Sequence, residues 1–156
     1  MTDIRLLWDD VSTADLEFEN NDITKSTGLR TSVIISLFTD RRARDDDVLP
    51  DPTSLDKRGW FGDLISPVTT GDQIGSRLWL LEREKTTPEV IKRAEEYCLE
   101  ALQWMIDDGV VASVDVKVER QESTLAIKVE LRKINGLVEA LEFSAEWDNM
   151  FLYDYP

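Results

Sequence analysis

The segment Ser36–Asp63 holds the side chains of this sequence that could do chemistry. Arg41, Arg42 and Arg44 precede a run of three aspartates, Asp45–Asp47. Loop carboxylates can bind calcium, and a close carboxylate pair can carry acid–base catalysis, as in glycosidases. Arginine forks near aromatic side chains can instead anchor a partner protein. The segment therefore raises three possibilities: a metal loop, a hydrolase site and a protein-binding surface.

The absence of histidine narrows these possibilities. Without an imidazole there is no Ser–His or Cys–His nucleophile pair and no imidazole metal ligand. Cys98 falls on the apolar stripe of a predicted helix, where we expect a small buried hydrophobe rather than a nucleophile. The acidic run Asp45–Asp47 lacks the glycine-punctuated alternation of an EF-hand loop. We therefore expect no metal and no cofactor.

Carboxylate catalysis is also disfavoured by the surroundings of the acids. The candidates are Asp45–Asp47, Asp51, Glu95 with Glu96, and Asp107 with Asp108. None lies in an apolar stretch that would raise a carboxyl pKa, and adjacent acids on a helix point in different directions. We therefore predict no catalytic residue and no enzymatic activity.

The arginines and aromatic residues keep two interpretations open. Trp60 and Phe61 stand between two glycines, which suggests a shaped turn that either presents or buries the rings. The arginines follow a predicted helix, so they could complement its C-terminus and pair with the aspartates, or they could anchor a partner. The predicted protein-contact residues are Arg41, Arg42, Arg44, Trp60, Phe61, Arg77 and Trp79.

Composition sets the class of protein. The chain has 156 residues, enough for one compact domain with a core of its own, and a net charge of −14. The acidic excess argues against a nucleic-acid ligand and favours basic partner surfaces, with mimicry of nucleic acid as a minor alternative. One cysteine permits no internal disulfide. The start "MTDIRLLWDD" is unlike a signal peptide, and no stretch approaches the roughly 18 apolar residues of a membrane span, so we expect no membrane contact and synthesis in a cytoplasm.

Short strands, a helix and a long loop are expected in the first half. Alternation predicts strands at Ile4–Trp8 and in "ADLEFEN", joined by a hairpin turn, with a further short strand in "NDITKSTG". "GLRTSVIISLFTD" has helical spacing. Residues 40–72 form a long irregular loop, a kind that is usually functional or flexible, and we expect it to be mobile in the isolated chain. A short helix follows in "IGSRLWLLEREK", with Ser76 as a possible cap.

The second half contains the clearest elements. A long helix is expected over Pro88–Asp108, capped by Thr87 or by Thr86 and stopped by Gly109. Three alternating strands follow, centred on Val114–Val118, Leu125–Leu131 and Leu141–Trp147; "QES" joins the first pair and "NG" the second. The apolar tail "DNMFLYDYP" should pack in this chain or in a partner. We guess that the strand "VDVKVERQE" lies at the sheet edge.

These elements predict an α+β fold in a single domain of residues 1–156. An antiparallel sheet with a C-terminal three-stranded meander packs on the long helix, accompanied by two shorter helices.

Four sequence blocks carry a resemblance to a known family. "SLFTDRRARDDDVLPD", "KRGWFGD", "GSRLWLLEREK" and "TPEVIKRAEEYCLEALQWMIDDGV", in this order, resemble the tail protein family of Mu-type phages and prophages, a baseplate component. That family is similar in turn to the small baseplate wedge protein of T-even phages, once labelled a tail lysozyme. The N-terminal hairpin and the extreme C-terminus match less tightly.

The resemblance implies a structural role in the virion. It implies a wedge protein of a contractile-tail baseplate, made in the host bacterial cytoplasm and present in several copies per baseplate. The implied partners are the larger baseplate wedge protein, the tail sheath protein, for which it offers a template through strand pairing, and tail hub or tube proteins. The lysozyme label does not carry over, because this chain has no matched catalytic pair. A peptidoglycan hydrolase of the tail and an acidic inhibitor or adaptor that binds a basic protein surface remain the alternatives.

Overall fold

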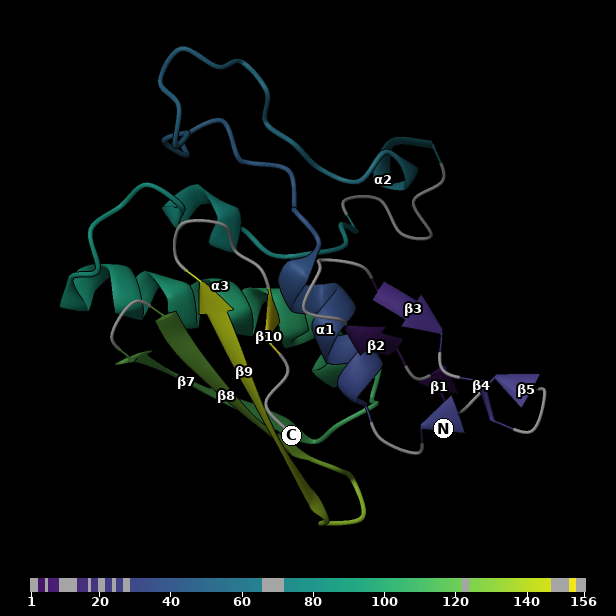
Figure 1. The fold of residues 1–156 in the computed structure, drawn as a ribbon. Coiled ribbons are helices and arrows are strands. Elements are labelled where there is room, and N and C mark those ends of the chain that lie inside the picture. The colour runs from purple at the N-terminus through teal and green to yellow at the C-terminus, as the bar shows by residue number, and fades with distance from the viewer. Residues whose placement is uncertain are drawn as a thin grey trace.

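The computed structural model describes residues 3–4, 6–8, 14–16, 18–19, 22–23, 25–26, 29–65, 72–121, 124–146 and 152–153. The fold is α+β, as predicted. Its centre is an antiparallel sheet of β7 (Ser113–Gln121), β8 (Thr124–Arg132) and β9 (Val138–Glu146), with the helix α3 (Pro88–Asp107) across one face (Figure 1). The two-residue strand β10 (Leu152–Tyr153) pairs with β9, so the strand order is β10-β9-β8-β7.

The helix α3 begins and ends where its sequence predicts. The Thr87 hydroxyl accepts a hydrogen bond from the Val90 N–H at 3.3 Å, which makes Thr87 the cap rather than Thr86. Gly109 follows the helix with φ +70°, the left-handed conformation that glycine adopts without strain. The apolar stripe faces the sheet; its buried members are Val90, Ala94, Cys98, Ala101, Leu102 and Met105.

The meander is held by alternation and by one tight turn. Its core-facing side chains are Val116, Val118, Leu125, Ile127, Val129, Leu131 and Phe143, all buried against α3 and its neighbours. The predicted "NG" hairpin is confirmed: Gly136 has φ +86°, and the Lys133 N–H donates to the Leu137 carbonyl at 2.8 Å. Glu122 and Ser123 of the predicted first turn lie outside the described residues. The edge prediction is also correct, because β7 is the outermost strand.

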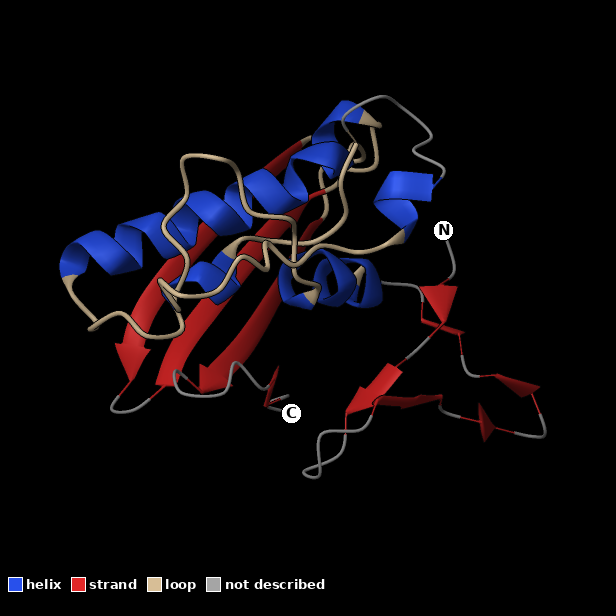
Figure 2. Cartoon of the chain, turned by 90° about the horizontal axis from the view of Figure 1, so that it is seen from above, coloured by secondary structure: helices blue, strands red, loops and turns tan. Residues whose placement is uncertain are grey.

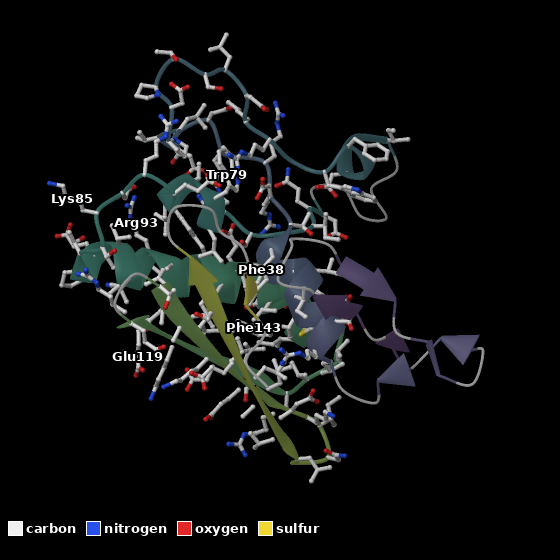
Figure 3. The ribbon with its side chains drawn as sticks, in the orientation of Figure 1. Phe38, Trp79, Lys85, Arg93, Glu119 and Phe143 are labelled. Carbon is white, nitrogen blue, oxygen red and sulfur yellow. The ribbon has the colours of Figure 1, made fainter. Side chains whose placement is uncertain are left out.

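A second helix closes the core. The helix α1 (Arg30–Phe38), predicted from its apolar spacing, contributes Val33, Ile34 and Leu37 to the same buried cluster as α3. At its end the Phe38 ring meets the Phe143 ring of β9 edge-on, with centroids 5.8 Å apart (Figure 3).

Six short strands precede α1 in the part of the chain that the structure describes. Strand β2 (Leu6–Trp8) pairs antiparallel with β3 (Ala14–Leu16), which confirms the predicted hairpin, although its turn lies outside the described residues. The other pairs are β1 (Asp3–Ile4) with β6 (Lys25–Ser26) and β4 (Phe18–Glu19) with β5 (Asp22–Ile23). The C-terminal tail packs at least in part within this chain, since β10 pairs with β9.

Two elements between the helices differ from expectation. The helix predicted over Ile74–Lys85 is only the 3-10 turn η1 (Leu78–Leu81), and Arg77, not Ser76, is the residue before it. Ser76 instead joins this segment to the end of α1, because its backbone forms a parallel bridge with Asp40 and its hydroxyl donates to the Leu37 carbonyl. The long loop contains one short helix, α2 (Gly62–Ile65), before residues 66–71, which are not described.

The close approach at the Ser76 bridge requires a glycine. Gly75 has φ +98°, and a Cβ atom built there would lie 2.3 Å from the Thr39 carbonyl oxygen. Gly136 also has a positive φ, of +86°, but no atom within 4 Å of a built Cβ. Substitution of the two glycines therefore distinguishes the cost of backbone strain, which both share, from the cost of a steric clash, which only Gly75 has.

We expect Gly75→Ala to destabilise the protein by at least about 2 kcal/mol more than Gly136→Ala. Both variants force an L-residue into the left-handed region, at about 1–2 kcal/mol each, but only Gly75→Ala also forces the chain away from Thr39. Urea unfolding of the two variants measures the difference. Equal losses would show that the contact at Gly75 is not a constraint.

The burial of Cys98 leads to a second prediction, which concerns the reactivity of its thiol. Its side chain is fully enclosed in the core, and this burial raises the pKa of the thiol far above its usual value. We expect an aromatic disulfide reagent to label Cys98 only as fast as the protein opens, and at once after denaturation in guanidinium. Labelling of the native protein at the rate of a small free thiol would contradict the packing of α3 on the sheet.

Candidate functional site

Arg77 is the centre of the arginine-rich region. Its guanidinium is almost fully buried; Nη1 donates to the two carboxylate oxygens of Asp47 at 2.7 and 3.0 Å, and Nε donates to Glu100 at 2.9 Å. The guanidinium also lies 4.5 Å from the centroid of the Tyr97 ring. Asp47 belongs to the long loop, and Glu100 and Tyr97 belong to α3. Arg77 therefore ties the loop to the outer side of α3.

Arg77 stays charged in this site. Burial acts to lower the pKa of its guanidinium, but the hydrogen bonds from Asp47 and Glu100 outweigh that effect and raise the pKa. A buried guanidinium with two carboxylate partners has its charge compensated, whereas each partner alone would be a costly buried charge.

Two further arginines converge on the carboxylate of Glu100. Arg44 forms an ion pair with Glu100, and Arg41 lies 3.6 Å from it while donating to the Gln73 carbonyl at 3.1 Å. Of the two alternatives open for these arginines, pairing with the C-terminus of α1 is therefore not what Arg41 and Arg44 do, because their guanidinium groups reach Glu100 of α3. A full carboxylate is a stronger partner than helix-end carbonyls.

A second arginine cluster lies beside the first. Arg58 donates to Asp40 at 2.9 Å and to both oxygens of Glu82 at 3.0 and 3.1 Å. Its guanidinium stacks 4.4 Å from the ring centroid of Trp79, a buried residue of η1 labelled in Figure 3. Burial, together with the nearby Glu82 carboxylate, raises the pKa of Asp40 although Arg58 acts to lower it. Arg58 thus connects the far arm of the loop to η1.

The two arms of the loop also touch each other. The Ala43 N–H donates to the Lys57 carbonyl at 2.9 Å, and Lys57 pairs with Asp45. A Cβ at Gly59 would lie only 2.8 Å from the Arg42 Cβ, so glycine permits this approach. Figure 2 shows the loop, in tan, lying over α3 on the side away from the sheet.

The structure divides the predicted contact residues into two groups. Arg77 and Trp79 are buried and Arg41 is half-buried, and all three hold the loop; the Trp79 indole N–H donates to the Arg41 carbonyl at 2.8 Å. The exposed group is Arg42, Arg44, Trp60 and Phe61. Sequence reasoning missed Arg58 and Glu100, and it considered Asp47 only as part of an acidic run, because nothing local marks their distant partners.

The described residues offer little for other chemistry. Among them, no group of three or more histidine, cysteine, aspartate or glutamate side chains is placed to hold a metal ion. None of the helices in the described ranges has the length and apolar character needed to span a membrane. A hollow at the start of α3 combines acidic and basic side chains, and its Glu84 and Arg93 pair with each other.

Comparison with known proteins places these residues in context. The family model described as "Phage protein GP46" matches residues 29–138, which include the loop, η1, α3 and the paired strands β7 and β8. The chain is 40% identical over 151 residues to "Baseplate protein gp46" of Escherichia phage Mu, covering 96% of this chain and 100% of that protein. It is 35% identical over 148 residues to "Mu-like prophage FluMu protein gp46" of Haemophilus influenzae, covering 94% and 98%.

We expect Arg77→Met to destabilise the protein by about 3–5 kcal/mol, because it leaves the nearly buried Asp47 carboxylate without its guanidinium partner, whereas Glu100 keeps its ion pair with Arg44. Arg93→Met is the matched control. Arg93 also pairs with a glutamate, but the Arg93 and Glu84 side chains are 39% and 40% exposed against 10% and 12% for Arg77 and Asp47, so its loss should cost about 0–1 kcal/mol.

Urea unfolding measures both costs, and hydrogen exchange locates them. Arg77→Met should speed exchange in residues 40–63 and spare the meander. The same exchange experiment on the wild type tests the expectation of a mobile loop, which these contacts oppose. Equal stability losses in the two variants would mean that Arg77 does not hold the loop.

Proposed function

This chain belongs to the phage protein GP46 family, and from that membership we propose that it is a structural, non-enzymatic component of a contractile phage tail baseplate. The observation that carries the proposal is identity along nearly the whole chain to a baseplate protein of phage Mu. Detection of this chain by mass spectrometry in purified tail particles tests it, and absence from intact particles would reject it.

The use of the acidic side chains supports a role without catalysis. Asp47 and Glu100 compensate Arg77, Asp40 and Glu82 compensate Arg58, and Glu95 accepts a backbone N–H of β7 at 3.0 Å. These carboxylates are engaged by groups of the protein itself, whereas a general acid must be within reach of the reacting group of a substrate. We therefore do not propose a peptidoglycan hydrolase.

Within the baseplate we propose a wedge protein that joins larger wedge proteins through its loop. Arg42, Arg44, Trp60 and Phe61 are the proposed contacts, because they are exposed on a loop that the ion pairs hold in place. Arg41, Arg77 and Trp79 would act indirectly, by fixing that loop.

We further propose that β7 accepts a strand of the sheath protein and so templates the first sheath ring. β7 is the outer strand of the sheet, and the Val118 N–H points outward to Glu95 of α3. Backbone N–H groups alternate in direction along an antiparallel strand, so the N–H groups of Val114 and Val116 point outward like that of Val118. Glu95 occupies one end of this edge, which leaves the half near Val114 for an incoming strand.

Charges on β7 fit an edge that must not pair with itself. Asp115, Lys117 and Glu119 alternate along its solvent face, and Glu119 pairs with Lys128 of β8 at 2.9 Å. Charged edge strands resist pairing with copies of themselves, while a complementary strand can still dock. The charges thus disfavour pairing of β7 with the β7 strand of another copy and leave the edge available to a sheath strand.

We expect Val114→Pro to weaken binding of the sheath protein by about tenfold or more, because it removes an outward N–H and places a ring at the edge. Proline is tolerated at an edge position whose N–H faces solvent, so the fold should survive. Val114→Ala is the control, since it loses the same half-buried side chain but keeps the N–H. Binding of the sheath protein to immobilised chain measures both, and equal affinity of the two variants would refute strand pairing at this edge.

A further inference from the structure

An exposed aromatic cluster lies at the end of the loop, which we call the aromatic knob: Trp60, Phe61 and Ile65. Their residues are 47%, 69% and 74% exposed, and the two rings lie 5.5 Å apart, tilted by 49°. Three large apolar side chains within six residues are thus exposed to water, two of them in ring–ring contact. Rigid aromatic side chains of this kind are the usual anchors of protein interfaces.

The knob has a fixed shape. A Cβ at Gly62 would lie 2.1 Å from two atoms of the Trp60 ring, so the indole rests directly on the glycine backbone. The Asp63 N–H donates to the Trp60 carbonyl at 3.2 Å, which closes the turn below the ring. The aromatic surface is therefore pre-organised, which lowers the entropy cost of docking.

Asp63, which lies within the same short segment as the knob residues, has an incomplete set of hydrogen bonds. Asp63 Oδ1 accepts the Ile74 N–H at 3.3 Å, whereas Oδ2 is covered and has no donor among the described residues. A covered oxygen without a donor has lost its hydration without compensation, and a donor from outside the chain would recover that loss. The site thus combines aromatic faces with an acceptor that lacks a donor.

The charge of the chain selects among possible occupants. With a net charge of −14, two copies repel each other, which disfavours a second copy on the knob. A cationic group is favoured by the overall charge, by the faces of Trp60 and Phe61, and by Asp63. Arginine fits best, because its planar guanidinium stacks on aromatic rings and also donates to carboxylates.

We propose that the aromatic knob docks an arginine-bearing segment of another protein, with a guanidinium over Trp60 that donates to Asp63. Because Asp63 Oδ2 is covered in the free chain, docking includes a shift of the side chains above it. The proposal deepens the proposed role of the loop, and so rests on that function for the identity of the partner as a tail protein. It does not depend on the β7 edge.

Nuclear magnetic resonance of the ¹⁵N-labelled full chain tests the proposal directly. The probe is a short capped peptide with arginines spaced by glycine and leucine, compared with its glutamine and glutamate counterparts. The arginine peptide should shift the indole signal of Trp60 and the amide signals of Gly62 and Ile74. The glutamine peptide should bind about tenfold more weakly, and the glutamate peptide should not saturate.

Internal controls exist within the same spectrum. The indoles of Trp79 and Trp104 donate inward, to the Arg41 carbonyl and the Ser36 hydroxyl, so their signals should stay unmoved. Shifts spread over the acidic surface would show general charge attraction and overturn the proposal. Concentration-dependent shifts of Trp60 without peptide would identify a second copy as the occupant and overturn it as well.

Variants separate docking from folding. Trp60→Ala removes the indole, and Gly62→Ala displaces it from the glycine backbone. Each variant should bind the arginine peptide about tenfold more weakly, and Asp63→Asn should weaken binding by a smaller factor. Leu137→Ala removes a similarly exposed apolar side chain at the β8–β9 turn without changing charge, and should leave binding unchanged.

The readouts also distinguish this proposal from the proposed function. Val114→Pro should bind the arginine peptide normally. Absence of the chain from tail particles, together with intact peptide binding, would reject the function and keep the docking site. Presence in particles, with arginine and glutamine peptides binding equally, would reject the docking site alone.

Discussion

The structure outside the core depends on one requirement: a buried guanidinium must have its charge compensated. The Arg77 guanidinium lies between η1 and α3, where water does not stabilise its charge. The carboxylates of Asp47 and Glu100 compensate that charge instead. Asp47 can reach Arg77 only if the loop folds back over α3. The Arg58 cluster then holds the returning arm. A loop with few apolar contacts is thus placed by electrostatics, while the sheet and helices are placed by apolar burial.

This division also shows how several acids of the described residues are used. Asp47 and Glu100 pair with Arg77, and the core below them is apolar. The net charge of −14 favours basic partners.

Sequence reasoning succeeded where the cause is local. The capping of α3 by Thr87, the stripe around Cys98 and the alternation of the meander are set by neighbours a few residues apart. It failed where the cause is distant. Arg77 is 30 residues from Asp47 and 23 from Glu100, and no periodicity joins them. The shortened η1 has the same origin, because Ser76 pairs with Asp40 instead of starting a helix. The contact residues stay a prediction, and their division into buried and exposed members needed the fold.

The buried guanidinium of Arg77 also bears on temperature. Hydration of ions becomes less favourable on heating, so the penalty for withdrawing Arg77, Asp47 and Glu100 from water shrinks as the solution warms. Apolar burial does not gain strength in the same way. Heating therefore affects the loop and the core differently. Near the melting point, the ion pairs that attach the loop keep their strength relative to the apolar packing of the core.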